Sequence, residues 1–222
     1  MGDSQSIFQR PPRGSRGPAP GHTRDEIVAA AVVLADADGL AAVSMRAVAA
    51  RLGTAAGSLY RYLSSRDDLL DLMADAAIGS MRPFPAAPDP FDALVLVARA
   101  QLAVYRRHPW LLEVIQRTSG VGPNGLAYFD HCLGVLAPLS CAVGRKFEAI
   151  AMMTGVASLF ARPQPEGVSF AGIDFSPYPH LAAALAGVAG AAAAASGAQA
   201  APEAEPDLFE RTIRSVLSGL LL

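Results

Sequence analysis

Residues 44–72 of this chain read SMRAVAARLGTAAGSLYRYLSSRDDLLDL, and the rest of the sequence is organised around them. Two short apolar stripes recur here with the i, i+3, i+4, i+7 spacing of one helix face. They consist of Met45, Val48, Ala49 and Leu52, followed by Ala56, Leu59, Tyr60 and Leu63. Gly53 lies between them, where a residue without Cβ best tolerates a sharp turn. Two helices joined by a short glycine-containing turn are typical of a DNA-binding helix-turn-helix.

The charge of this stretch favours the same interpretation. Between residues 44 and 66 the only ionisable side chains besides two tyrosines are Arg46, Arg51, Arg61 and Arg66, whereas the whole chain has a net charge of −2. A basic segment in a near-neutral chain is typical of an element that contacts phosphates. An ordinary helical hairpin with solvated arginines has the same periodicity, so the pattern alone leaves that alternative open.

Several runs of residues resemble the N-terminal module of the tetracycline-repressor (TetR) family of bacterial transcriptional regulators. The runs are Leu52-Gly53, Gly57-Ser58-Leu59-Tyr60-Arg61-Tyr62 and Ser65-Arg66-Asp67-Asp68-Leu69-Leu70, with the upstream segments 23–37 and 39–46. Together they cover about the first third of the chain. Further along, His108-Pro109-Trp110 and Gly122-Pro123-Asn124-Gly125 more weakly resemble a subtype of the family's regulatory domain.

Composition predicts an all-α protein, because 52% of its 222 residues are hydrophobic while β-branched and aromatic residues are too sparse and irregular for a sheet. We expect a three-helix helix-turn-helix DNA-binding domain at residues 23–81. A C-terminal helical ligand-binding and dimerisation domain should follow at residues 82–222, after the proline-rich run 82–90. Residues 1–22 should form a disordered basic arm. Its cations Arg10, Arg13 and Arg16 either reach a minor groove or make no contact, and both alternatives stay open.

Capping residues predict where the N-terminal helices begin. Thr23 and Glu26 have the spacing of a capping box, which starts a helix over residues 23–37. Ser44 is expected to cap the next helix. Ser65 and Asp68 repeat the capping-box spacing and start a fourth helix.

The C-terminal domain is expected to contain further helices. They are a helix from Pro90 to His108, a short helix from Pro109, a helix that buries Leu126, Phe129, Leu133 and Leu136 after a loop at 120–125, an apolar helix over 147–160, a weak helix over 180–189 and a periodic helix over 207–222. Residues 162–176 show no helical period, and the low-complexity run 190–206 should be mobile.

The second helix of the motif, over residues 54–63, should lie in the major groove of DNA. Helix geometry puts Thr54, Gly57, Ser58 and Arg61 on its outer face. The resemblance places Arg46, Ala56, Gly57 and Ser58 near base edges, and Ser44, Tyr60, Tyr62 and Arg66 near phosphates. Family members usually carry a capping Ser where this chain has Ala55, so we expect Thr54 to cap one residue earlier.

A small-molecule effector is implied by the resemblance, because the family places its inducer between the DNA-binding module and the dimerisation helices. The candidate residues there are Tyr105, Trp110, Phe129, His131, Met152, Met153 and Phe160. Aromatic side chains and methionines suit an apolar cavity, with Tyr105, His131 or Arg99 as polar partners. The alternative is that each of these side chains simply fills a core.

Dimerisation is expected through the helices 147–160 and 207–222. The first is apolar nearly all round and the second has more apolar surface than one core face needs, so we expect both to pair with their symmetry mates in a four-helix bundle. The alternative is that both only complete the monomer core.

Other classes of function lack sequence support. No P-loop, dinucleotide fingerprint, Gly-x-Ser-x-Gly elbow or His/Cys pair with zinc spacing is present, so we expect no enzyme, cofactor or metal. Cys132 and Cys141 are interpreted as small core residues, with a redox sensor as the alternative. No signal peptide or membrane span is expected, which predicts a cytoplasmic protein. We therefore expect a homodimeric repressor released from a palindromic operator by a small apolar molecule. The alternative is a ligand-independent regulator or activator whose C-terminal domain only dimerises.

Overall fold

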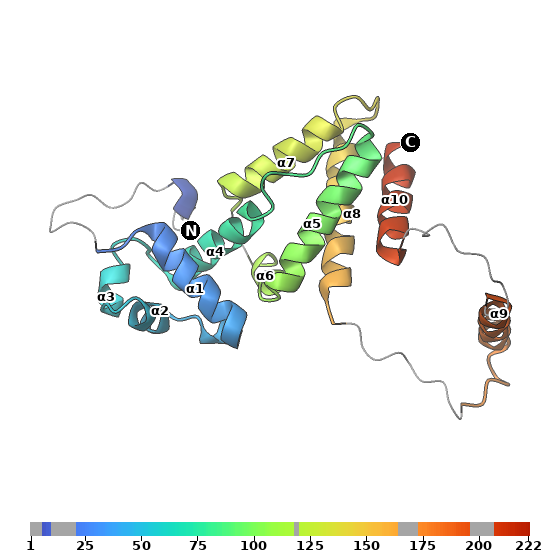
Figure 1. The fold of residues 1–222 in the computed structure, drawn as a ribbon, viewed down its shortest axis with the longest axis horizontal. Coiled ribbons are helices and arrows are strands. Elements are labelled where there is room, and N and C mark those ends of the chain that lie inside the picture. The colour runs from blue at the N-terminus through green and yellow to red at the C-terminus, as the bar shows by residue number, and fades with distance from the viewer. Residues whose placement is uncertain (1–5, 10–20, 118–119, 164–172, 196–206) are drawn as a thin grey trace, which may run out of the picture. The chain divides into compact units, whose positions relative to one another are not determined.

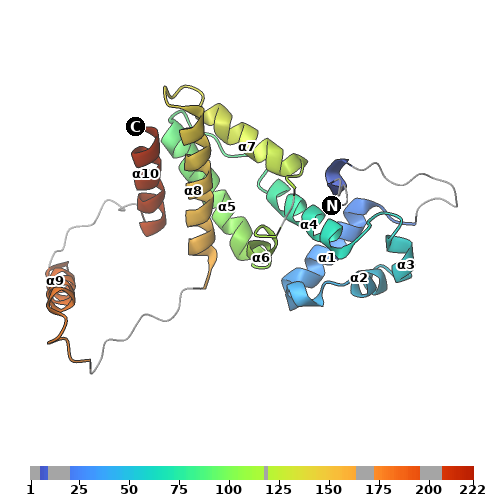
Figure 2. The ribbon, with the colours of Figure 1, turned by 180° about the vertical axis from the view of Figure 1, so that it is seen from behind.

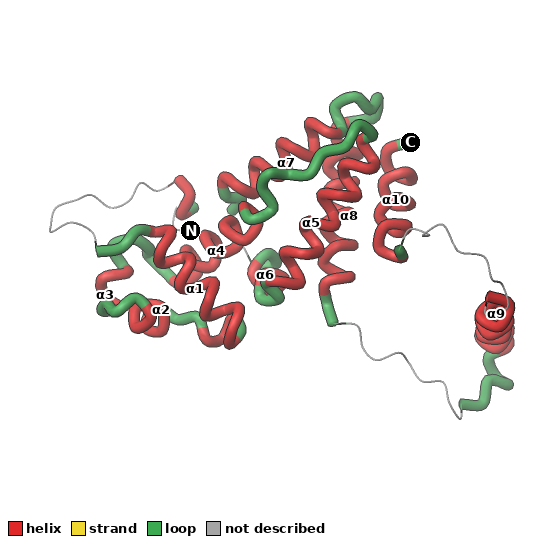
Figure 3. Tube along the Cα trace, in the orientation of Figure 1, coloured by secondary structure: helices red, strands yellow, loops and turns green. Residues whose placement is uncertain are grey.

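The structure is a computed structural model that describes residues 6–9, 21–117, 120–163, 173–195 and 207–222. Within these ranges the chain forms helices joined by loops and turns, without strands (Figures 1 and 3). The predicted all-α class is therefore confirmed. The chain divides into one unit of residues 1–162 with 208–222 and a second unit of residues 163–207. The second unit holds helix α9, Pro179–Ala195, which extends past the predicted end at 189.

The N-terminal helices begin at the residues that the capping patterns predict. Helix α1, Arg24–Asp38, has the complete Thr23–Glu26 capping box. Helix α2, Met45–Arg51, begins after Ser44, whose hydroxyl accepts a hydrogen bond from the Ala47 N–H. Between these helices lies a 3₁₀ turn, η2, over Leu40–Ala42. Helix α4, Arg66–Gly79, begins after Ser65. These helices surround one core that includes Ile27, Ala31, Val48, Leu59, Leu69 and Met73.

Two predicted N-terminal caps differ in detail. Helix α3 spans only Ala56–Leu59, and its N-cap is Ala55, without a side-chain hydrogen bond. The expectation that Thr54 caps it is wrong, because the Thr54 hydroxyl is bonded to the Ser58 hydroxyl at 2.9 Å. Ser65 does accept from the Asp68 N–H, but the Asp68 carboxylate accepts from the N–H of Ser64 rather than completing a capping box.

The C-terminal bundle is built from α5, Pro90–Arg107, α6, Leu111–Val114, α7, Pro123–Val135, α8, Val143–Ala161, and α10, Leu208–Leu221. Helix α5 begins as predicted, with the Asp89 carboxylate accepting from two backbone N–H groups and Pro90 at the first helical position. Helix α8 packs against both α5 and α10 (Figures 1 and 2). Helix α10 lies against them through Phe209, Ile213, Leu217 and Leu221, all buried.

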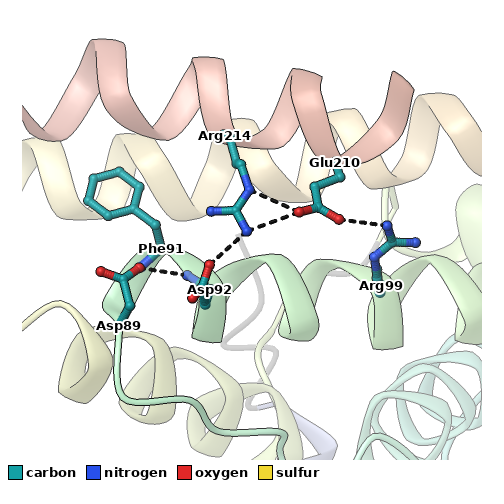
Figure 4. Close-up of polar contacts among 6 residues, drawn as sticks. All are labelled: Asp89, Phe91, Asp92, Arg99, Glu210 and Arg214. Carbon is teal, nitrogen blue, oxygen red and sulfur yellow. Dashed lines mark hydrogen bonds and ion pairs between the residues drawn. The ribbon is translucent and has the colours of Figure 1, made fainter. Parts of the chain in front are cut away.

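Charged side chains also attach α10 to α5 (Figure 4). Glu210 on α10 accepts hydrogen bonds from Arg99 of α5 at 2.8 Å and from Arg214 at 2.9 Å. Arg214 also donates to Asp92 of α5 at 2.7 Å. Both apolar burial and ion pairs thus hold α10 against the bundle.

The buried face of α7 differs from the predicted stripe. Leu126 is 60% exposed, while Tyr128 and Cys132 are buried together with Leu136. The helix also begins at Pro123, inside the predicted loop 120–125. Because apolar residues occur all round this helix, its periodicity did not define the inner face. Tertiary hydrogen bonds of Tyr128 decide the rotation instead.

The N-terminal arm is not wholly irregular. Ile7–Gln9 form a 3₁₀ turn, η1, and Ile7 is only 2% exposed. Burial of an isoleucine against α4 gives this segment a fixed place, so the prediction of a disordered arm is wrong for these residues. Arg10, Arg13 and Arg16 lie outside the described residues, as do positions 164–172 and 196–206. No helix in the described ranges is both long and apolar enough to cross a membrane.

Candidate DNA interface and effector pocket

The outer surface of α2, α3 and their turn carries most of the predicted DNA contacts. Gly53 has a φ of +66°, the left-handed conformation that the turn between the helices requires and glycine best tolerates. Leu59 and Leu63 are buried beneath this surface. Ser44, Arg46, Gly57, Tyr60 and Arg61 are exposed, whereas Thr54, Ala56, Ser58, Tyr62 and Arg66 are half-buried. The fold thus brings these ten residues to one end of the molecule's N-terminal part.

The hydroxyl groups on this surface already have partners. Ser58 donates to the Ala55 carbonyl at 2.7 Å and is bonded to Thr54, so it shapes the turn before α3 as well as facing outward. The Ser44 hydroxyl caps α2. Gly57 would allow a Cβ without contact, so the surface is open at that position. Arg46 and Arg61 are therefore the long, exposed cations that can extend from this face.

Arg66 has a structural role that sequence reasoning missed. Its guanidinium donates to the Val43 carbonyl at 2.8 Å and to the Leu40 carbonyl at 2.9 Å. These bonds join the start of α4 to the η2 turn before α2. Arg24 similarly donates to the Tyr62 carbonyl at 3.1 Å. The predicted phosphate contact of Arg66 would therefore use those guanidinium N–H groups that do not bond to these two carbonyls.

A pocket of about 240 Å³ lies between α4, α5, α7 and α8. Its lining residues are Asp71, Ala74, Asp75, Ile78, Met81, Gln101, Tyr105, Ile115, Gly120, Val121, Gly122, Gly125, Tyr128, Phe129 and Thr154. Most of this lining is apolar, as in small-molecule sites generally. Of the seven residues proposed from the sequence, only Tyr105 and Phe129 are among them.

The other five proposed ligand residues lie elsewhere. Met153 is fully buried in the core and Met152 is 53% exposed on the opposite face of α8. Phe160 packs edge-on against Phe209 of α10, with ring centroids 5.3 Å apart. His131 stacks on Phe84, and its Nε2 lies 3.3 Å from the Pro85 carbonyl. Helical spacing does not show which faces of neighbouring helices meet at this pocket.

Trp110 forms part of a different site, a junction between α1 and the corner of α5 and α6. Its indole Nε1–H donates to Asp36 of α1 at 2.7 Å. His108 Nδ1 lies 2.7 Å from the same Asp36 oxygen. Trp110 is 3% exposed and His108 8% exposed, so this carboxylate joins two nearly buried rings to the first helix. Arg99, another suggested ligand partner, is engaged with Glu210.

A hydrogen-bonded group of four polar side chains lines one wall of the pocket. Gln101 donates to the Tyr105 hydroxyl at 3.0 Å and to Thr154 at 3.4 Å, and it accepts from Tyr128 at 3.3 Å. Burial raises the pKa of Tyr105 to about 12 and that of Tyr128 well above its ordinary value. Both phenols therefore stay protonated and remain donors at neutral pH. In the sequence, this group is indicated by Gln101, a polar residue on the otherwise apolar face of α5.

Asp75, another residue of the pocket lining, connects α4 to α7. Its carboxylate accepts from the backbone N–H groups of Asn124 and Gly125, both at 3.0 Å, and from the Asn124 side chain at 3.0 Å. An anion at a helix N-terminus is stabilised by those free N–H groups and by the helix dipole. Gly122 approaches so closely that a Cβ there would lie 2.3 Å from the Asp75 carboxyl carbon.

The cysteines give no sign of a redox pair. Both are free, and burial raises the pKa of the Cys132 thiol to about 12, which suppresses the reactive thiolate. Within the described ranges no group of His, Cys, Asp and Glu side chains is arranged to hold a metal ion.

The fold is all-helical, with an N-terminal helix-turn-helix and a C-terminal helical bundle that contains a pocket. This combination defines a class of transcriptional regulators. Residues 27–73 match the model of bacterial regulatory proteins of the tetR family, and residues 82–221 match the tetracyclin repressor-like C-terminal domain. The chain therefore belongs to the tetR family.

Two relatives show the level of similarity. The HTH-type transcriptional repressor DrrR1 of Streptomyces coeruleorubidus is 43% identical over 157 residues, which are 68% of this chain and 57% of DrrR1. An HTH-type transcriptional regulator of Saccharopolyspora erythraea is 38% identical over 133 residues, 60% of this chain and 56% of that protein. The matches thus span little more than half the length of these relatives.

A solved structure supports the fold. ActR from Streptomyces coelicolor, in complex with actinorhodin, superposes with a TM-score of 0.71 over 92% of this chain and 98% of ActR. The two sequences are 22% identical, so this likeness concerns the fold.

Proposed function

We propose that this protein is a cytoplasmic, homodimeric repressor that leaves a palindromic operator when a small molecule fills the pocket between α4 and α7. One observation carries the proposal: α4 supplies pocket residues at one end, Asp71 to Ile78, while its start is tied by Arg66 to the turn before α2. A single helix thus contacts both the proposed effector pocket and the turn before the helix-turn-helix. The family membership and the repressor DrrR1 support the same function.

The coupling would run through packed elements with fixed contacts. An effector that enlarges the pocket pushes α4 away from α7, against the Asp75 bonds to the start of α7. The Asp36–Trp110 bond provides a second connection, from the α5–α6 corner to α1. Movement of α1 and α4 would change the spacing of the two recognition helices from the ~34–36 Å that successive major grooves require.

Dimerisation would use the outer face of α8. Val143, Phe147, Met152 and Leu159 are 64%, 46%, 53% and 60% exposed along this helix. Ala151 and Gly155 are exposed among them and allow close approach of a second helix. On α10, however, Phe209, Ile213, Leu217 and Leu221 are buried within the monomer. Substituting Ile213 would therefore disturb the monomer core and could not by itself test the dimer interface.

The dimer proposal is tested by comparing two exposed apolar residues. Phe147→Glu on α8 should shift sedimentation to the monomer and weaken operator binding, because a carboxylate would be buried between symmetry mates. Leu126→Glu on α7, an equally apolar exposed site, should leave the dimer intact. If Phe147→Glu remained dimeric, α8 would not be the interface.

The DNA-binding function is tested by selection from a random duplex library. The protein should enrich a two-fold symmetric sequence, with half-sites about one helical turn apart or a multiple of it. Arg46→Ala should reduce discrimination between enriched and mutated sites by about 1–3 kcal/mol if it makes a bidentate base contact. Failure to enrich any sequence would refute the proposed function. Retention of operator at all effector concentrations would favour a ligand-independent regulator.

A further inference from the structure

The pocket has an unbalanced charge. Among the described residues that line it, Asp71 and Asp75 are acidic and none is basic. Asp75 is compensated by the N–H groups at the start of α7. Asp71 lies one helical turn before it on α4, and nothing in the described part of the chain forms a hydrogen bond or ion pair with its carboxylate. The two carboxylates therefore differ, with Asp75 serving the fold and Asp71 facing the pocket without a partner.

The surroundings of Asp71 disfavour its negative charge. Partial burial, followed by the nearby charges of Asp68 and Asp67, raises the pKa of the Asp71 carboxyl above its ordinary value. The side chain is only partly buried, so water still reaches the carboxylate. An anion in this position gains from any cation that enters the pocket, because the cation offsets both desolvation and repulsion.

The rest of the lining restricts what kind of cation fits. Ile78, Met81 and Phe129 offer apolar and aromatic surface, which favours an apolar body over a hydrated metal ion. The lining also contains Gln101 and Tyr128, whose N–H and O–H groups can donate hydrogen bonds to a neutral oxygen of a ligand. Charge, apolar surface and hydrogen-bonding groups thus line one cavity.

We infer that the effector is an apolar, ring-containing molecule that carries a protonated amine, and that the amine pairs with Asp71 while the rings lie against Ile78, Met81 and Phe129. This inference rests on the proposed effector pocket and narrows the small apolar molecule expected from the sequence to a cationic one. Pairing also neutralises a charge on α4 one turn from Asp67 and Asp68. The ligand's charge therefore acts directly on the helix that joins the pocket to the helix-turn-helix.

The test compares two fluorescent probes of nearly equal shape, 9-(aminomethyl)anthracene and 9-(hydroxymethyl)anthracene. Their dissociation constants are measured by fluorescence anisotropy with the full chain and two variants. Asp71→Asn removes the proposed partner, and Asp130→Asn removes an exposed carboxylate on α7 outside the pocket. Thermal unfolding of each variant checks that the fold is retained.

The parent and Asp130→Asn should bind the amine about tenfold more tightly than the alcohol, as expected for one charge-assisted hydrogen bond in a partly exposed site. Asp71→Asn should bind both probes alike, and rising salt should reduce the preference of the parent. Equal binding of both probes by the parent would overturn the inference while leaving the effector pocket in place. An amine preference that survives in Asp71→Asn would overturn it as well, since the charge would be bound elsewhere.

Operator binding separates this inference from the proposed function. If neither probe binds while the selected operator is still retained, the cationic ligand is refuted and the DNA-binding function stands. If the amine binds through Asp71 but leaves operator affinity unchanged, the ligand class is supported and the effector role of the pocket is refuted. A protein that enriches no DNA sequence refutes the repressor, whatever the probes do.

Discussion

Replacing Asp36 by Ala should destabilise the protein through the junction of α1 with the α5–α6 corner. The carboxylate oxygen lies 2.7 Å from both Trp110 Nε1 and His108 Nδ1. The substitution leaves these two ring nitrogens, on side chains that are 3% and 8% exposed, without the acceptor they now share. A hydrogen bond to a charged group contributes about 1.5–3 kcal/mol.

The exposure of Asp36 lowers the loss in free energy of unfolding that two such hydrogen bonds would otherwise predict. Its side chain is 33% exposed, so water can reach the site and replace part of the lost acceptor. We therefore expect a loss of about 2–4 kcal/mol in the free energy of unfolding. Asp36→Asn keeps an oxygen acceptor but removes the charge, so it should lose only about 1–2 kcal/mol.

Urea unfolding measures these losses. Trp110 is the only tryptophan, so its fluorescence reports the junction directly, while far-UV circular dichroism follows the helices. Coincident transitions by the two probes would justify a two-state free energy. The control is Asp38→Ala, which removes an exposed carboxylate at the end of the same helix and should change stability by less than about 0.5 kcal/mol. A loss for Asp36→Ala no larger than the control's would refute the stabilising role of the junction.

Three further predictions concern other contacts. Arg66→Ala should lower the free energy of unfolding by about 1–2 kcal/mol, because its carbonyl contacts are lost, and should also weaken DNA binding. Arg61→Ala, at an exposed position, should weaken DNA binding alone. Urea unfolding measures the first effect and salt titrations of DNA affinity measure the second. Gly122→Ala should cost about 1–3 kcal/mol in urea unfolding because its Cβ would overlap Asp75, and an unchanged stability would contradict the close approach. Hydrogen bonds from Arg99, then Arg214, lower the pKa of Glu210, so its stabilising effect is lost as pH falls below its ordinary value of 4.5. Glu210→Gln should therefore flatten the acid side of the melting-temperature profile.

The sequence alone determined the features that depend on residues close together in the chain. The capping box of Thr23 and Glu26 joins groups three positions apart, and it is present where predicted. Gly53 turns the chain between α2 and α3, and Asp89 with Pro90 begins α5. Periodicity likewise predicted the apolar stripe of α10, since the spacing of its residues defines one helix face. Such signals are local because each hydrogen bond or stripe forms within a few residues.

Rotation of helices about their own axes was the first property that the tertiary structure decided. Apolar residues surround α7 and α8, so periodicity could not show that Tyr128 faces inward or that Met152 faces outward. The rotation depends on neighbours from distant parts of the chain, such as Thr154, which bonds Tyr128. For this reason only Tyr105 and Phe129 of the predicted ligand residues line the pocket between these helices.

Long-range hydrogen bonds between polar groups were the second property that the tertiary structure decided. Arg66 bonds carbonyls 23 and 26 positions away, and Trp110 bonds Asp36 at a separation of 74 positions. No local pattern links such residues, because they meet only after α1, α4 and the α5–α6 corner have packed together. The sequence therefore determined that the chain has helices, a DNA-binding motif and an apolar regulatory domain. Packing decided which carboxylate supports the fold and which one, Asp71, is left facing the pocket, because that choice depends on where the start of α7 comes to lie.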